Sequence, residues 1–427
     1  MLGETQRSPL TSSVAKVCPV KTYAFAGASK RALDMYAAPI LERFGESARI
    51  GGFFDTNPVR AAYLGRASAA PVFADFDEML RQARPDCVIV TTIDRYHHEY
   101  IIRALEAGCD VITEKPMTID DERCRAILAA EQRTGKHVTV TFNYRFMPYV
   151  TRVKELLVAG TIGEVLNVDF EWYLDRRHGA DYFRRWHRRK ENSGGLLVHK
   201  ATHHFDLINW WLGDEPDHVF ALGQRRFYGP THAERGERCA TCAFAGTCEF
   251  HVEYRDDEFM QAFYFAAEQH DGYMRDRCVF SEEIDIEDTM NVLARYRNGA
   301  QLSYSLVAYS PYEGWRSTLT GTKGRIELLE AESGPQAEEQ HSTITVYSRD
   351  GQVQCHQIPK AAGDHGGGDD RLRDRLFGAQ ELPDLLGHMA GSRAGAMSVL
   401  LGVAANQSIA SGQAVRIDDL LQEPSRH

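Results

Sequence analysis

Several features are missing from this chain of 427 residues, and each absence narrows its class. No apolar run is long enough to cross a membrane, and the first twenty residues lack the apolar core of a secretion signal. Basic residues are not in excess, because the formal net charge is −11, and this disfavours nucleic-acid binding. The length suits two domains. We expect a cytoplasmic protein that binds neither nucleic acid nor membranes.

Cysteine is scarce outside one segment. Five of the nine cysteines are scattered and are expected to be small buried hydrophobic residues: Cys18, Cys87, Cys109, Cys124 and Cys355. The other four form Cys239-x2-Cys242-x5-Cys248, with Cys278 thirty residues later. This set predicts a structural tetrahedral zinc, with His251 as the alternative fourth ligand. An iron–sulfur site or four free thiols are the alternatives. The metal is expected to hold a polar insert at about residues 225–281.

The N-terminal part alternates short apolar runs with helical patterns. We expect strands at 22–26, 49–54, 86–91, 110–113 and 137–141, and helices at 31–44, 97–107 and 120–134. Continuous apolar strands separated by helices are typical of a parallel sheet that is covered on both faces.

After residue 146 the pattern changes to alternating strands with few helices between them. Strands are expected at 165–173, 219–223, 289–296, 300–310, 316–320, 324–329 and 342–348, followed by a long helix near 382–411. The predicted fold class is therefore α/β plus α+β. A Rossmann-type parallel sheet occupies residues 1–146, with 1–20 as a lead-in, and a mainly antiparallel domain occupies 147–427. A broad sheet of this kind leaves one face to be covered, which favours a homo-oligomer.

The first strand leads into a degraded dinucleotide-binding fingerprint. Of the three glycines expected in G-x-G-x-x-G, only the first is present, and Ser29 and Ala32 replace the others. Asp55, at the end of the second strand, can bind the adenine ribose and would repel a 2′-phosphate, so NAD is favoured over NADP. The alternative is that Asp55 only caps the next helix. The predicted pyrophosphate-binding residues are Gly27, Ala28, Ser29, Lys30 and Arg31.

The triplet Glu114-Lys115-Pro116 ends a buried strand, Asp110 to Thr113. Burial of a lysine costs several kcal/mol unless it is paired, and proline cannot continue a strand ladder. Ligands bind at the carboxyl ends of such strands. Lys115 is therefore expected to point at a reacting group.

A second ionisable cluster follows Gly194-Gly195. His199, His203 and Asp206 share one predicted helix face, with Lys200 beside them. Histidine and lysine suit proton transfer near neutral pH. The alternative is a solvated helix face, and His204 is expected to be structural.

Residues 175–190 are rich in arginine in an otherwise acidic chain. One interpretation is a pocket for an anionic sugar, with guanidinium donors for the anion and aromatic rings for the sugar. The other is a solvated loop that faces another subunit. The candidate substrate residues are Arg177, Tyr182, Arg185, Trp186, His187 and Lys200.

Taken together, these motifs resemble the Gfo/Idh/MocA oxidoreductase family, which includes glucose–fructose oxidoreductase and inositol dehydrogenase. The similarity spans Glu114-Lys115-Pro116, the Gly-Gly segment followed by His203-x-x-Asp206, and Asn143 at the end of the sixth strand. Thr92 and His97 match the family's Thr-Pro…His pattern, although Ile93 replaces the proline.

The resemblance implies that Lys115 approaches the nicotinamide and the substrate hydroxyl, that His203 is an acid/base or orienting group, and that Asp206 binds substrate. The main functional hypothesis is an NAD-dependent sugar dehydrogenase. The second is an NAD-dependent glycoside hydrolase, similar to family members that release anionic sugars such as sulfoquinovose. A non-enzymatic NAD-binding protein is the third.

Overall fold

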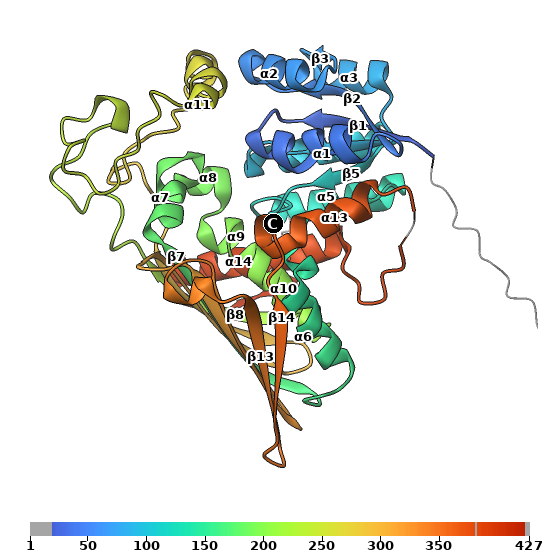
Figure 1. The fold of residues 1–427 in the computed structure, drawn as a ribbon, viewed down its shortest axis with the longest axis vertical. Coiled ribbons are helices and arrows are strands. Elements are labelled where there is room, and N and C mark those ends of the chain that lie inside the picture. The colour runs from blue at the N-terminus through green and yellow to red at the C-terminus, as the bar shows by residue number, and fades with distance from the viewer. Residues whose placement is uncertain (1–18, 381, 423–427) are drawn as a thin grey trace, which may run out of the picture.

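The computed structural model describes residues 19–380 and 382–422, so the predicted scattered cysteine Cys18 lies outside the described residues. Two sheets form the molecule, with a loop-rich insert beside them (Figure 1). This arrangement confirms the predicted fold class. Within the described residues, no helix has the length and apolar character needed to span a membrane.

The first sheet has seven strands in the order β15-β6-β5-β4-β1-β2-β3. β1 to β6 are parallel, as predicted, and β15 is antiparallel to β6. The strands are β1 Lys21–Ala26, β2 Ala48–Phe54, β3 Val72–Phe73, β4 Cys87–Val90, β5 Asp110–Thr113, β6 Val138–Val140 and β15 Ala390–Gly391. The helical elements of this part are η1 Ala32–Ala37, α1 Ala38–Arg43, α2 Pro58–Ser68, α3 Phe76–Ala83, η2 Asp94–Tyr96, α4 His97–Glu106, α5 Asp121–Thr134 and η3 Asn143–Phe146.

The second sheet has nine strands in the order β14-β13-β12-β11-β7-β10-β9-β8-β16. All neighbouring pairs are antiparallel except β7 and β10. The strands are β7 Val165–Asp175, β8 Pro216–Gln224, β9 Thr289–Tyr296, β10 Gln301–Ser310, β11 Gly314–Gly321, β12 Gly324–Ala331, β13 His341–Ser348, β14 Val353–Pro359 and β16 Val415–Arg416. Burial alternates along β9 and β10, because one face packs on the core and the other faces outward.

Helices cover the inner face of this sheet and connect it to the first domain (Figure 1). They are α6 Pro148–Val158, α7 Arg176–Arg184, η4 Trp186–Arg188, α8 Lys190–Ser193, α9 Leu196–His199, α10 Thr202–Leu212, η7 Pro335–Glu338, η8 Asp364–Gly367, α13 Gly368–Phe377, α14 Ser392–Ser411 and α15 Ile417–Leu421. The predicted helix near 382–411 begins only at Ser392, because it follows the short strand β15.

Two late segments return to the first sheet. β15 extends that sheet at its β6 edge. α13 packs beside β1 and α1, where the ring of Phe377 meets that of Tyr23 at 5.1 Å between centroids. The two sheets therefore do not correspond to two unbroken stretches of chain.

The insert between β8 and β9 contains η5 Cys239–Thr241, α11 Glu258–Phe263, η6 Phe265–Ala267 and α12 Glu268–Asp271. Its α11 lies near α2 of the first domain (Figure 1), where Phe263 and Tyr63 form an edge-to-face pair at 5.2 Å. Apolar burial against the Rossmann domain thus holds this part of the insert in place.

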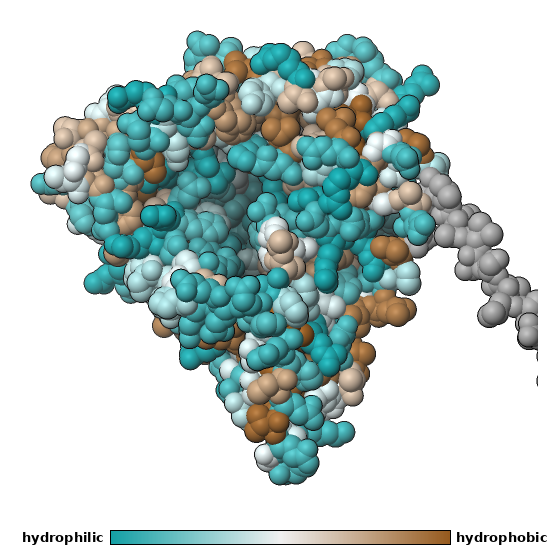
Figure 2. Space-filling view, viewed as in Figure 1, coloured by the Kyte–Doolittle hydropathy of each residue, from teal (hydrophilic) through white to brown (hydrophobic). Residues whose placement is uncertain are grey.

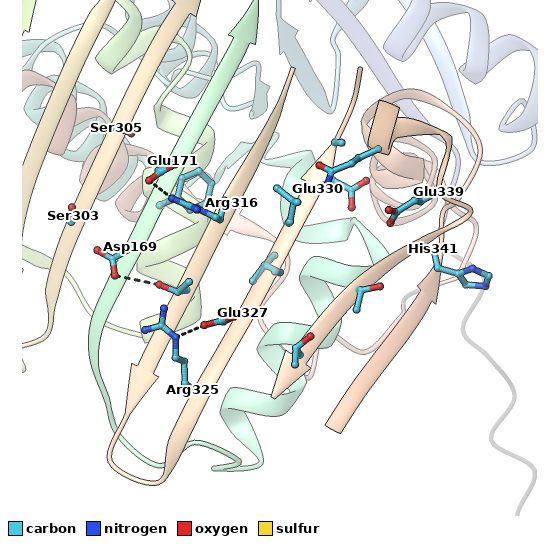
Figure 3. A pocket seen from close by; sticks show the side chains of 18 of the residues that line it. Asp169, Glu171, Ser303, Ser305, Arg316, Arg325, Glu327, Glu330, Glu339 and His341 are labelled. Atoms are coloured by element: carbon cyan, nitrogen blue, oxygen red, sulfur yellow. Dashed lines mark hydrogen bonds and ion pairs between the residues drawn. The ribbon is translucent and has the colours of Figure 1, made fainter. Parts of the chain in front are cut away.

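Two depressions mark the surface. One is a cleft between the first sheet and α7–α9, and the surface is visibly hollowed between α1 and α8 (Figure 2). The other lies on the outward face of the second sheet, where charged side chains such as Arg316 and Glu171 pair with each other (Figure 3). The cleft lies at the carboxyl ends of the parallel strands, where ligands of such sheets bind, and it is therefore the candidate site.

Candidate active site

The cleft has a volume of about 470 Å³ and lies at the carboxyl ends of the parallel strands β1, β2, β4 and β5. Ligands of open parallel sheets bind in this position. Most of the predicted site residues line it: Ala28, Ser29, Lys30, Arg31, Asp55, Thr92, His97, Glu114, Lys115, Asn143, Tyr182, Arg185, Trp186, His187, His199, Lys200 and His203. Residues from both predicted domains therefore meet in one site.

The turn after β1 depends on Gly27. Its φ is +101°, and a Cβ atom there would lie 2.7 Å from the backbone of Thr91 and Thr92. Only glycine fits this close approach. Gly27 lies outside the set of cleft-lining residues, and Ser29 supports the next turn by accepting the N–H of Ala32 at 3.0 Å.

Asp55 ends β2 and faces the cleft, but it is not the cap of α2. Its Oδ2 accepts the N–H of Ala28 at 2.7 Å, and its Oδ1 accepts the N–H of Asn57 at 2.7 Å. Asn57 is the N-cap residue of α2. Asp55 thus joins the ends of β1 and β2, which leaves its ribose-binding role as a prediction.

The end of the cleft beside Ala28 and Asp55, the predicted nucleotide site, is called here the nucleotide end, and its charged residues are paired with one another. Arg31 donates to Glu114 and Asp369, both at 2.8 Å, and Tyr36 donates to Glu114 at 2.6 Å. The Asn143 amide donates to Asp369 at 2.5 Å, while its oxygen has no hydrogen-bond partner among the described residues. Glu114 and Arg31 therefore position the loops around the cleft.

His97 joins two of these loops. Its ring nitrogens lie 2.9 Å from the Pro116 carbonyl and 3.1 Å from the Thr92 carbonyl. Burial lowers its pKa. A histidine with both nitrogens on backbone carbonyls is a positioning group for the segments that carry Thr92 and Lys115.

Lys115 projects from the end of β5 into the centre of the cleft, and the Lys115–Pro116 peptide is cis. Its Nζ donates to the His199 carbonyl at 3.2 Å. Burial lowers the pKa of this ammonium to about 8, with Lys200 acting in the same direction and Asp94 opposing it. Lys115 can therefore gain and lose a proton near neutral pH.

Three imidazoles surround this lysine. His187 and His199 meet edge to face at 4.2 Å, and His203 stacks on Tyr144 at 4.3 Å. Burial, followed by nearby cations, lowers the pKa of each well below its usual value. These rings are therefore neutral at physiological pH, and each has an unprotonated nitrogen that can accept a hydrogen bond.

Lys200 lies deeper in the cleft wall. Its Nζ sits 4.5 Å from the centroid of Trp172. Burial lowers its pKa, whereas Glu332 and Glu313 raise it. Burial also raises the pKa of Glu332 to about 7. Lys200 and Glu332 therefore influence each other's charge state.

Asp206, a predicted substrate ligand, and His204, a predicted structural residue, both lie outside the cleft lining. Asp206 is buried and receives two hydrogen bonds from Arg145, at 2.6 and 2.7 Å, outside the cleft. Its predicted contact with substrate gains no support from this position. His204 packs between Phe170 and Trp172 and contacts the Tyr304 hydroxyl at 2.8 Å, which is a structural environment.

The arginine-rich segment is largely a helix, and its basic residues point in several directions. Asp175 caps α7 by accepting the N–H groups of Arg177 and His178. Arg177 is exposed and lies outside the cleft lining. Arg184 points into the insert, where it donates to the Phe250 carbonyl at 2.7 Å. Of the six arginines from Arg176 to Arg189, Arg185 is the one that lines the cleft.

The insert covers the nucleotide end of the cleft. Asn57 donates to the Ala267 carbonyl at 3.0 Å and to Asp271 at 2.9 Å, and Arg60 pairs with Asp271. Tyr264, Asp271, Tyr273 and Arg275 of the insert all line the cleft. A nucleotide bound at Asp55 would therefore contact the insert as well as the Rossmann domain.

The clustered cysteines lie apart from the cleft. Cys239, Cys242, Cys248 and Cys278 line one cavity of about 20 Å³, together with His251. Within the described residues, no group of three or more His, Cys, Asp or Glu side chains could hold a metal ion. The predicted zinc centre is therefore not confirmed.

Several cleft residues were not predicted from the sequence. They are Asp34, Arg60, Thr91, Ile93, Asp94, His178, Tyr264, Asp271, Tyr273, Arg275 and His365. Asp94 lies only two residues after Thr92, so the motif that contains Thr92 was the available signal for it. The insert residues carry no local motif, because only the packing of the insert on α2 brings them to the site.

Two family models match this chain. Residues 21–142 match the NAD-binding Rossmann fold of the Gfo/Idh/MocA oxidoreductase family, and residues 154–417 match its C-terminal alpha/beta domain. The Bacillus subtilis protein YteT, whose name describes it as an oxidoreductase, is 39% identical over 94% of this chain and 99% of its own length.

Other relatives match shorter regions. Inositol 2-dehydrogenase of Rhizobium meliloti is 32% identical over 41% of this chain and 50% of its own length. D-glucoside 3-dehydrogenase of Escherichia coli is 30% identical over 34% of this chain and 40% of its own length.

Solved structures share the fold. An oxidoreductase domain protein of Kribbella flavida aligns with a TM-score of 0.67 at 16% identity, over 94% of this chain and 99% of that chain. The WlbA dehydrogenase of Bordetella pertussis, solved with NADH and UDP-GlcNAcA, aligns with a TM-score of 0.62 at 18% identity, over 93% and 98%. The two family models together span most of the sequence, and the chain is a member of the Gfo/Idh/MocA oxidoreductase family, with an NAD-binding Rossmann domain followed by the family's C-terminal domain.

Proposed function

We propose that this protein is an NAD-dependent sugar oxidoreductase that transfers a hydride between a ring-hydroxyl carbon and NAD. The observation that carries this proposal is the position of Lys115. Its side chain has a pKa of about 8 and lines the same cleft as the neutral imidazole of His203. The names of the inositol and glucoside dehydrogenase relatives support a sugar or polyol substrate.

The chemistry divides between cofactor and protein. Bound NAD accepts the hydride that leaves the carbinol carbon. Neutral Lys115 takes the proton of the hydroxyl, so that the carbinol becomes a carbonyl, and His203 orients the oxygen or relays the proton. Asp55 is assigned to the adenine ribose, which supports NAD rather than NADP.

An anionic sugar is the substrate class that we propose. Arg185 and Arg275 both line the cleft, and the Nε of each has no hydrogen-bond partner among the described residues. Asp181 already pairs with Arg185 at 2.9 Å, so part of this charge is compensated. Guanidinium groups in the cleft lining suit a carboxylate, sulfonate or phosphate on a sugar.

The test is an assay with purified protein, NAD and matched acidic and neutral sugars. The proposal predicts stoichiometric NADH, detected at its nicotinamide absorbance, and higher kcat/KM for the acidic member of each pair. Tight NAD binding without NADH formation from any sugar would overturn the oxidoreductase proposal. Equal kcat/KM for both members would overturn only the anionic class.

The second candidate is an NAD-dependent glycoside hydrolase. The observation that favours it is a second hydrogen-bonded set of polar groups beside the cleft: the Tyr182 hydroxyl lies 2.9 Å from Nε2 of His178, and Nδ1 of His178 lies 2.7 Å from Glu313. Net oxidation of one hydroxyl needs a single acid/base pair, whereas elimination needs another.

In that reaction, NAD when bound would supply the hydride acceptor, and Lys115 would take the proton of the hydroxyl, so that the carbinol becomes a ketone. A base removes the proton on the adjacent carbon, and the bond to the aglycone oxygen breaks as a carbon–carbon double bond forms. An acid protonates the departing oxygen, water adds across the double bond, and the hydride returns. Aglycone release without net NADH, with solvent deuterium at the α-carbon, distinguishes this reaction from dehydrogenation.

Two further predictions concern assembly and metal content. The outward face of the second sheet bears side chains of both charges (Figure 3), which supports a homo-oligomer through that face. For the cysteines, the shared cavity supports a structural zinc, although the thiols would have to turn toward one another. Native mass spectrometry and elemental analysis test these two predictions, and a metal-free monomer contradicts both.

A further inference from the structure

Asp94 is a buried carboxylate in the catalytic part of the cleft. It begins η2, just after β4, and is 3% exposed. Its Oδ2 lies 2.5 Å from Nδ1 of His199. Burial of a carboxylate costs several kcal/mol unless a partner compensates. The contact with His199 therefore calls for an explanation in terms of stability or function.

His199 comes from the other domain and is held at two points. Gly194 and Gly195, with φ of +68° and +78°, make the turn that starts α9 and sets the position of His199. While Asp94 contacts its ring, Lys115 donates to its backbone carbonyl at 3.2 Å. The segments that follow β4 and β5 thus both contact His199, which belongs to the C-terminal domain.

The charge of the surroundings decides where the proton of this pair lies. Burial is the largest influence on Asp94 and raises its pKa, and Glu114 acts in the same direction, whereas Lys115 and, more weakly, Arg185 favour its carboxylate form. His199 faces Lys115, His187, Arg185 and His203, and burial keeps the imidazole neutral. A neutral imidazole carries one N–H. When that N–H is Nδ1–H, donated to a carboxylate, Nε2 is left with a lone pair.

We propose that Asp94 is a positioning residue, which accepts Nδ1–H of His199 and so presents an unprotonated Nε2 that accepts a hydrogen bond from a substrate hydroxyl and aligns it with Lys115. The inference rests on the proposed function, because the hydroxyl is that of the sugar. It assigns His199 a role that differs from that of His203, which stacks on Tyr144.

The kinetic test uses Asp94→Asn, which keeps the size of the side chain but replaces an acceptor by an amide that can donate to Nδ1. We expect kcat to fall about 100-fold or more, as for other losses of acid–base alignment. Asp94→Asn combined with His199→Gln should be no slower than His199→Gln alone. The dissociation constant of NAD and the melting temperature should change little.

The chain offers a matched control. Asp217 and His218 form a second contact between a carboxylate and an imidazole Nδ1, at 2.8 Å, on the surface and away from the cleft. Asp217→Asn should leave kcat unchanged. An Asp94→Asn enzyme with wild-type kcat would overturn the proposal, and equal losses in both variants would attribute the effect to general instability.

A second readout does not require activity. In protein labelled with ¹⁵N-histidine, we expect His199 to show the Nδ1–H tautomer in the wild type and the Nε2–H tautomer in Asp94→Asn, with His199→Gln used for assignment. If His199 has the same tautomer in the wild type and in Asp94→Asn, the inference is wrong. If the wild type oxidises no sugar but the tautomer switches, the proposed function fails while the Asp94–His199 pairing stands.

Discussion

The two ends of the cleft contain similar residues in different electrostatic surroundings. At the nucleotide end, Arg31 pairs with Glu114 and Asp369. At the proposed catalytic end, Lys115 is buried beside imidazole rings and forms no ion pair among the described residues, although the nearby Asp94 and Glu114 raise its pKa. Paired charges hold loops in place, whereas burial without full pairing moves pKa values toward neutrality. The comparison distinguishes residues such as Arg31 and Glu114, which hold the loops of the site in place, from Lys115, for which we propose proton transfer.

The largest expected effect is at the catalytic end. Replacement of Lys115 in Lys115→Met removes the proposed base, so kcat should fall about 10²–10⁴-fold. The dissociation constant of NAD should change little, because Arg31, Glu114 and Asp369 remain paired. Steady-state kinetics and calorimetric titration with NAD measure the two quantities.

Lys21→Met is a suitable control, because Lys21 is exposed at the start of β1 in the same sheet. It should keep wild-type kcat. Full turnover in Lys115→Met would remove the distinction between the two ends.

The next largest effect is expected on stability, from the buried ion pair of Arg145 and Asp206, which lies outside both ends of the cleft. Arg145 and Asp206 are 5% and 1% exposed. Asp206→Asn should lower the free energy of unfolding by about 3–5 kcal/mol, because an unpaired buried guanidinium remains. Chemical denaturation measures the loss. If instead stability is kept and KM for the sugar rises, Asp206 is a substrate ligand, as the family resemblance implies.

A smaller effect is expected from the nucleotide end. Asp55→Ala removes a charged acceptor for the adenine ribose, worth about 1.5–3 kcal/mol, so the dissociation constant of NAD should rise about 10–100-fold. At saturating NAD, kcat should remain close to wild type. Asp77→Ala, an exposed pair with Arg103, serves as the control in the same titration. A fall in kcat without weaker NAD binding would place Asp55 in the chemistry.

The smallest effect is in the pH dependence. Sugar oxidation requires neutral Lys115, whose pKa is about 8. Below that pH the ammonium predominates, so kcat/KM should fall about tenfold per pH unit and should level off above it. NAD binding over the same range should vary less. A flat kcat/KM profile through pH 8 would mean that another group accepts the proton.

Local sequence patterns predicted the parallel sheet well. Apolar strands such as Asp110–Thr113 are where the pattern placed them, because a strand buried on both faces must be continuously apolar. The same patterns brought Lys115, His199 and His203 to the candidate site, since strand ends and helix faces fix the direction of side chains. Their catalytic roles remain predictions.

The arginine-rich segment shows where local patterns fail. Residues 176–184 form a helix, and a helix turns successive side chains to different sides. Arg184 consequently enters the insert while Arg185, one residue later, lines the cleft. Composition alone gives the number of arginines in this segment, but it cannot predict which of their side chains reach the cleft.

The sequence by itself determined the sheet types, the nucleotide-binding half and many of the residues that line the cleft, because strand periodicity and short motifs are local properties. Only the tertiary structure decided that Asp94 contacts His199, that Arg145 takes Asp206 out of the cleft, and that the insert covers the nucleotide end. Each of these contacts joins residues far apart in the chain, and it exists only because packing of the two domains brings them together.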